Sequence, residues 1–438
     1  MDRVGMTGAQ SLDYRHNALG IVLLILTILA VVARIFISAG VLDGFVSYTS
    51  EGGSFIVKFH LAAYAIVSVL ILALVSRPFL LSTADLSLFR SLLRIGGALV
   101  FLTFLIVATS GVSATGFIID TYLVAVLTGL LLLTQTPDAR RIVGECVIIL
   151  MITSAIIAIG ELVSQTRLLP FTEDEPFFRP TGLAGHPLAL GAHIALTIGF
   201  VALTRWPLWL RAMLILVLFV GLAASGARLA TLAGAAEILL LLCLSRWQKL
   251  SLRRERQAKL LIVLCAIICG ALLVFTLSSA GFLGRFNNSL ADDNSLARVK
   301  IYQIFNYVSW RDIMLGMDAN TLLLLVRTNL QIYFIESAPV FIILTLGLPA
   351  AVAFAIIIMI FFVRLFNAAS VEARIAMLVL IAVDLSNNGF ATKNPDVILL
   401  TTLAISFLPV SPAKAGRKTS QSHQVVSTTS RWSVRLRV

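Results

Sequence analysis

Charged side chains are scarce in this sequence. Asp, Glu, Lys and Arg make up 13% of its 438 residues, whereas about a quarter is usual for a soluble domain. Hydrophobic residues make up 59%, and the mean hydropathy is +0.97. This composition excludes a chain whose main solvent is water. The net charge of +12 does not indicate nucleic-acid binding, because the basic residues fall between apolar runs and form no single patch.

Cysteine and histidine are also rare, with four cysteines and five histidines. The cysteines lie within or beside apolar runs, so they have no place in an extracytoplasmic disulfide framework. Cys265 and Cys269 share a helix face, but two thiols are too few for a closed zinc site. His186 and His193 also share a face and lack a third ligand. We therefore expect no metal and no cofactor, and we expect His193 to pack or to form hydrogen bonds in the core.

Long apolar runs are abundant. A helix needs about 20 apolar residues to cross roughly 30 Å of hydrocarbon. The sequence predicts an all-α polytopic integral membrane protein of about 12 transmembrane helices. The first run lacks a small-residue cleavage site, so we expect it to be a retained helix after a cytoplasmic segment, 1–18. The predicted spans are 19–40, 57–76, 92–112, 115–134, 143–163, 187–204, 210–224, 229–245, 260–280, 338–363, 375–390 and 396–410.

The distribution of Lys and Arg predicts the orientation of these helices, because short cytoplasmic loops retain basic residues. With both termini in the cytoplasm, the inner segments hold 23 Lys and Arg and the outer segments hold 10. The membrane domain is then 19–410, followed by a basic tail, 411–438. We expect the tail to be disordered and to be attracted to anionic membrane lipids. Two long outer loops, 164–185 and 281–337, are candidates for function.

The first candidate site is the segment from Arg179 to Gly191, which reads RPTGLAGHPLALG. Arg179 can hold a phosphate, Gly182 permits a close backbone approach, and His186 precedes a proline that opens the next helix. Helix N-termini bind anions readily. The alternative is an ordinary Pro/Gly turn with a snorkelling arginine.

Two further basic sites lie in outer segments. Ser225-Gly-Ala-Arg228 forms a short turn between apolar helices, and Arg298 and Lys300 lie in the longer loop. Arginines from separate segments can grip a pyrophosphate through bidentate hydrogen bonds. The alternatives are a topological arginine for Arg228 and a solvated face for the other two.

The order of four motifs resembles that of the O-antigen ligase and O-antigen polymerase superfamily. The motifs are the Arg-x-x-Gly-x-x-x-His-Pro turn, the Ser-x-x-Arg turn, the basic loop and the Leu-Gly that follows it. They also resemble its exopolysaccharide branch of the VpsF type. The 12-helix layout, with a large periplasmic loop between helices nine and ten, matches over nearly the whole chain.

The resemblance implies glycosyl transfer from an undecaprenyl-pyrophosphate-linked glycan to an acceptor sugar at the periplasmic face of a bacterial inner membrane. Arg179, Arg228 and Arg298 would neutralise the pyrophosphate leaving group. Ligases of this family carry a His-Asn pair where this chain has Glu336-Ser337, so Glu336 is the candidate base. Its alternative is a salt bridge with a loop arginine. A second departure is Asp318, which stands where many relatives have glycine.

The missing histidine favours a polysaccharide polymerase, with a chain-length regulator as a possible partner, over a ligase that transfers finished glycan to a lipid core. A third possibility is a transporter or flippase of lipid-linked sugar, which should carry charges through the middle of the membrane. The ionisable residues in or near spans are Arg34, Asp120, Glu161, Glu237 and Asp384.

Overall fold

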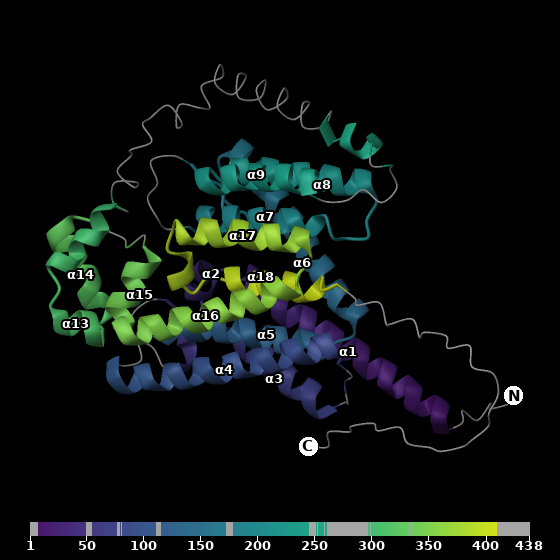
Figure 1. The fold of residues 1–438 in the computed structure, drawn as a ribbon, viewed down its shortest axis with the longest axis horizontal. Coiled ribbons are helices and arrows are strands. Elements are labelled where there is room, and N and C mark those ends of the chain that lie inside the picture. Colours follow the sequence, from purple (N-terminus) through teal and green to yellow (C-terminus); the bar gives the residue numbers. More distant parts are fainter. Residues whose placement is uncertain are drawn as a thin grey trace, which may run out of the picture. The chain divides into compact units, whose positions relative to one another are not determined.

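The computed structural model describes residues 8–49, 55–76, 79, 81–110, 115–171, 178–244, 251, 253–257, 259–260, 297, 299–332, 335 and 337–409, with the side chains of 8–17 and 109–110 excepted. Contacts separate one compact unit, Met1–Leu408, from a second, Pro409–Val438, of which only Pro409 is described. The predicted tail, 411–438, therefore lies outside the described residues. All regular secondary structure in the described residues is helical (Figure 1).

The helices follow one another through the membrane domain, with short 3-10 turns and one π-helix, η3, between them. In chain order they are α1 (Gly8–Phe36), α2 (Ala39–Asp43), η1 (Phe55–Lys58), α3 (Leu61–Ser76), α4 (Thr83–Ser110), η3 (Ile118–Leu123), α5 (Val124–Leu133), α6 (Pro137–Ser164), α7 (Pro187–Val201), α8 (Leu208–Ala224), α9 (Arg228–Leu244), η4 (Ile301–Asn306), α13 (Trp310–Leu315), α14 (Ala319–Leu330), α15 (Ala338–Leu346), α16 (Leu348–Ala368), α17 (Val371–Leu385), η5 (Gly389–Ala391) and α18 (Asp396–Ser406).

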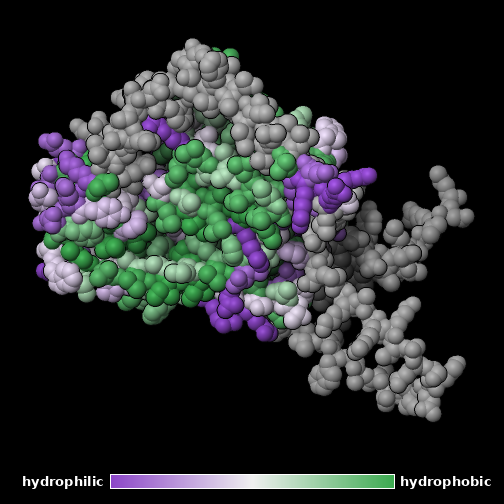
Figure 2. All heavy atoms as spheres, turned by 45° about the horizontal axis from the view of Figure 1, so that its top comes forward, coloured by the Kyte–Doolittle hydropathy of each residue, from purple (hydrophilic) through white to green (hydrophobic). Residues whose placement is uncertain are grey.

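The chain is an all-α membrane protein. Four helical segments are long and apolar enough to cross a bilayer, namely Ala18–Phe36, Thr83–Ala108, Pro137–Ser164 and Leu348–Ala368. Large apolar side chains stand exposed along them, including Phe101 and Phe104 at 69% and 73%. Figure 2 shows such side chains gathered over one broad face. In water this surface would be a strong aggregation site, whereas lipid tails solvate it.

The core is centred on α7, which is buried along almost its whole length. It contacts α17, α8, α9, α6 and α18, and Figure 1 shows it between the α8–α9 pair and α17. Its small residues allow these close contacts. A Cβ at Gly199 would lie 2.7 Å from the Cβ of Ala376 on α17. α7 begins at Pro187. Because it contacts five other helices, its N-terminus is held in a fixed position within the bundle.

A helix coincides with each predicted span except 260–280, most of which lies outside the described residues. One of these expectations was wrong in detail, because the span predicted at 338–363 is broken at Gly347 into α15 and α16. Gly347 has a φ of +81° and packs against Gly316, whose φ is +83°. A Cβ on Gly347 would lie 2.9 Å from the Gly316 nitrogen. This glycine contact fixes α13 against the start of α16.

The described part of the long loop contributes to a second, smaller core. Ile301 and Ile304 of η4 pack there with Leu322, Val326 and Leu330 of α14, and Val340 and Leu344 of α15 belong to the same cluster. The described residues of this loop are mostly helical.

Candidate functional site

The structure brings together two of the predicted motifs, the Arg179 turn and the Ser225–Arg228 turn. Arg179 Nε donates a hydrogen bond to the backbone oxygen of Ser225 over 3.3 Å. Ser225 caps the C-terminus of α8, and α9 begins three residues later at Arg228. The N-terminal part of α7 packs against the Ser225–Arg228 turn, because a Cβ at Gly191 would lie 2.6 Å from the Cβ of Ala227. The starts of α7 and α9 thus meet beside Arg179.

Two glycines give the Arg179 turn its shape. Gly182 has a φ of +50° and Gly185 a φ of +74°. A Cβ at Gly182 would lie 2.7 Å from the backbone oxygen of Ser154 on α6, and one at Gly185 would collide with Ser38, between α1 and α2. Gly182 thus lies close to the protein's own backbone, and its role in binding a phosphate stays a prediction.

Glu161, near the C-terminus of α6, forms hydrogen bonds with the backbone of this turn. Its Oε1 accepts from the Leu168 N–H at 2.8 Å, and its Oε2 accepts from the Thr181 and Gly182 N–H groups at 2.8 and 2.9 Å. The residue is only 4% exposed. Three backbone donors therefore satisfy both oxygens of this buried carboxyl group. The sequence marked Glu161 as an acid near a span, but nothing in it indicated these partners.

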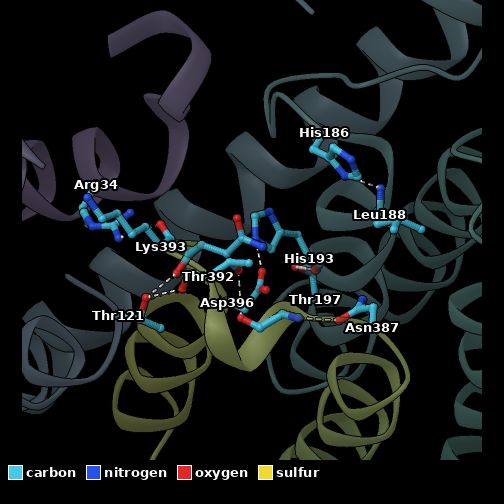
Figure 3. A network of polar contacts seen from close by, with 12 residues as sticks. Arg34, Thr121, His186, Leu188, His193, Thr197, Asn387, Thr392, Lys393 and Asp396 are labelled. Carbon is cyan, nitrogen blue, oxygen red and sulfur yellow. Dashed lines mark hydrogen bonds and ion pairs between the residues drawn. The ribbon is translucent and has the colours of Figure 1, made fainter. Parts of the chain in front are cut away.

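His186 is the N-cap of α7. Its Nδ1 accepts from the Leu188 N–H at 3.1 Å, so this contact, drawn in Figure 3, leads to the helix start and not to a metal. Since helix N-termini carry partial positive charge, the paired starts of α7 and α9 with two arginines make an electropositive site.

A second polar network adjoins this site through Ser38. Arg34, which is 2% exposed, donates from Nη2 to the backbone oxygens of Asp120 and Lys393 at 2.9 and 3.2 Å. The Asp120 carboxylate accepts from the Tyr48 hydroxyl at 2.9 Å and from the His60 N–H at 3.1 Å. These bonds join α1, the α2–α3 segment, η3 and the α17–α18 turn. Asp120 lies in the π-helix η3, a local distortion that often accompanies functional sites.

Lys393 completes this network and was missed by the sequence analysis. Its Nζ donates to the backbone oxygen of Lys58 at 2.7 Å and lies 4.5 Å from the centre of the Tyr48 ring. Burial lowers the pKa of Lys393, and the nearby Asp120 charge opposes that shift. Burial likewise raises the pKa of Tyr48. A lysine in an Asn-Pro-Asp context carries no local signal of a tertiary role.

His193 pairs with Asp396 in the core, which confirms the structural role expected for this histidine. Its Nε2 lies 2.6 Å from Asp396 Oδ1, and both side chains are at most 2% exposed. Figure 3 shows the pair beside the Thr392–Lys393 turn. Among the described residues, no group of three His, Cys, Asp or Glu side chains could hold a metal ion.

The remaining predicted residues do not join the Arg179 site in the described part of the chain. Lys300 is exposed at the start of η4, and its side chain forms no capping hydrogen bond there. Arg298 and Glu336 lie outside the described residues. Asp318 is the N-cap of α14, where its side chain accepts from the Asn320 N–H at 3.0 Å. That capping role explains an aspartate at this position.

Comparison with models of known protein families finds no match, and comparison with curated protein sequences finds no match either.

Proposed function

We propose that this chain is a metal-independent membrane glycosyltransferase. In this proposal it polymerises repeat units carried on undecaprenyl pyrophosphate, at the periplasmic face of a bacterial inner membrane. The observation that carries the proposal is the contact of Arg179 with Ser225, beside the starts of α7 and α9. Two arginines and two helix N-termini at one place suit a pyrophosphate better than a neutral ligand.

The proposal includes the finer topology of 12 spans with both termini in the cytoplasm. In that orientation the C-terminal ends of α1, α6 and α8 and the starts of α7 and α9 lie at the outer side. Lipid-linked donors that have been flipped across the membrane reach the protein there.

The reaction joins an acceptor hydroxyl to the anomeric carbon of the donor. The new C–O bond forms as the bond to pyrophosphate breaks, and the leaving oxygen takes up negative charge. Arg179, Arg228 and Arg298 stabilise that charge, which is often the largest catalytic contribution. Glu336 accepts the hydroxyl proton. Gly182 and His186 in the Arg179 turn, and Lys300 on the long loop, are the further residues proposed to bind the donor.

The test replaces Arg228 with lysine, which keeps the charge but loses the planar two-point donor. Loss of such a donor slows a reaction by about 10²–10³. Cells with Arg228→Lys should accumulate single lipid-linked repeat units on the outer leaflet, at normal protein level. The units are extracted, sized by mass and probed with an impermeant reagent.

The matched control is Arg205→Lys. Arg205 is 69% exposed and lies 3.7 Å from Asp138, far from the Arg179 turn in the proposed topology. It should support full-length polymer. Full-length polymer in Arg228→Lys as well would contradict the proposed role, and units trapped on the inner leaflet would identify a flippase.

Two alternative functions remain, a ligase and a transporter. A ligase would use the same arginines but would join finished glycan to a lipid core. A transporter of lipid-linked sugar is favoured by a separate observation, the buried acids Glu237, Asp384 and Asp396, which are at most 2% exposed. Such residues often mark transport or proton pathways.

A further inference from the structure

The core contains buried carboxyl groups of two kinds. Glu161 and Asp120 accept hydrogen bonds from backbone or hydroxyl donors. Asp384 on α17 is 1% exposed, and its Oδ2 meets no donor among the described residues. Glu237 on α9 is also buried, and its carboxyl group lies against Gly199 of α7. An ionised carboxylate without donors is very unfavourable in a low dielectric, so such a group takes up a proton instead.

Asp384 has titratable neighbours on each nearby element. Asp396 at the start of α18 interacts with it electrostatically, and Asp396 lies 2.6 Å from His193 on α7. Tyr122 of η3 donates to the Phe390 oxygen at 2.8 Å in the turn that covers them. From α9 the nearest acid in the core is Glu237, which packs against Gly199, nearly two turns below His193.

The turn after α17 closes directly over Asp384. A Cβ at Gly389 would lie 2.8 Å from Asp384 Oδ1 and 2.9 Å from Asn387 Oδ1. His193 Nδ1 is buried and has no partner in the described part of the chain. Asn387 and Asn388 are half buried, so polar groups lead from the turn toward Asp384.

We propose that Asp384, beside the His193–Asp396 pair, is a proton-binding site. With its proton bound, the Asp384 carboxyl is neutral, as a buried group without a donor at Oδ2 requires. Release of that proton leaves a single negative charge beside the His193–Asp396 pair. The ligand is a proton, and the site stands whether the chain transfers glycan or transports it.

The experiment uses the full chain in lipid nanodiscs and dicyclohexylcarbodiimide, which adds to protonated carboxyl groups to give a stable N-acylurea. Peptide mass spectrometry measures labelling across a pH series. Asp384 should be labelled near neutral pH and less so as pH rises. Glu161 in the same sample should stay unlabelled, because its oxygens already accept hydrogen bonds from three N–H groups.

His193→Gln distinguishes a proton site from a structural acid. Loss of the imidazole, the basic group of the adjacent pair, should make Asp384 labelling persist to higher pH. The proposal would be overturned by two negative results together. Asp384 would stay unlabelled, and the infrared spectrum of the unaltered protein would show no protonated-carboxyl band that disappears in Asp384→Asn. An unchanged pH profile in His193→Gln would overturn it as well.

Discussion

Gly182 lies in the left-handed region, with a φ of +50°, and a Cβ there would lie 2.7 Å from the Ser154 oxygen. Gly182→Ala should therefore lower the free energy of unfolding by about 1–3 kcal/mol, because an alanine is strained in this region and the backbone oxygen cannot move away cheaply. Thermal unfolding of the purified protein in detergent measures the change.

Gly160→Ala is the matched control. Gly160 lies on α6, close to the same turn, but no atom lies within 4 Å of a Cβ built there. Alanine is the better helix former by about 1 kcal/mol, so this variant should be unchanged or slightly more stable. Equal losses of stability in both variants would show that the turn imposes no special constraint at Gly182.

At this scale the sequence predicted which residues could bind phosphate, but it did not predict their partners. Arg228 was found because an arginine in a short outer turn between apolar helices is unusual, and Arg179 because it begins a Pro/Gly-rich segment before a predicted helix. The contacts of Glu161 with Thr181 and Gly182, and those that give Lys393 and Asp396 their roles, join residues that are 20 or more positions apart in the sequence, as between His193 and Asp396. Local patterns carry no information about such contacts.

The segment between α6 and α7 is held as a unit by one side chain. Glu161→Gln keeps the size of that side chain but has a single acceptor oxygen, so at least one buried N–H group is left without its partner. Each such group costs about 1–3 kcal/mol. The segment should open more often, and limited trypsin should cut after Arg167 faster than in the unaltered protein, as followed by mass spectrometry.

Glu145→Gln serves as the control, since it removes an acid from the same helix. Glu145 forms an i,i+4 ion pair with Arg141 at 3.2 Å, and both side chains are more than 20% exposed. A pair of this kind contributes at most about 1 kcal/mol. Cutting after Arg167 should therefore be unchanged. Equal cutting in the Glu161→Gln variant would mean that Glu161 does not hold the segment.

Helices could be predicted from apolar run lengths because backbone groups in lipid must pair within their own segment. The break of the predicted span 338–363 at Gly347 could not be predicted from run length. Its cause is the contact with Gly316, 31 positions earlier in the chain, and a single glycine inside an apolar run is compatible with an unbroken membrane helix. The buried residues of α14, by contrast, recur every four positions in the sequence, at Leu322, Val326 and Leu330.

At the scale of the whole molecule, polar groups are gathered inside an apolar exterior. Arg34, Asp120, Glu161, Glu237 and Asp384 are all at most 4% exposed, whereas Phe101 and Phe104 are exposed. This arrangement is the one that lipid requires, because charges are solvated by protein and apolar groups by lipid tails. It holds for either orientation of the chain, so burial does not determine which end of the bundle faces outward.

The orientation rests instead on the 23 basic residues expected inside against 10 expected outside, and it yields the last prediction. In a background with the four cysteines replaced, single cysteines at Arg254 and Lys300, both exposed, should differ in labelling of intact cells by an impermeant maleimide. Lys300→Cys should react directly, and Arg254→Cys only after the membrane is permeabilised. Equal reactivity would mean that the number of spans between them is even, and the Arg179 turn could then no longer be assigned to the outer face. The opposite pattern would place that turn in the cytoplasm, where a flipped donor cannot reach it.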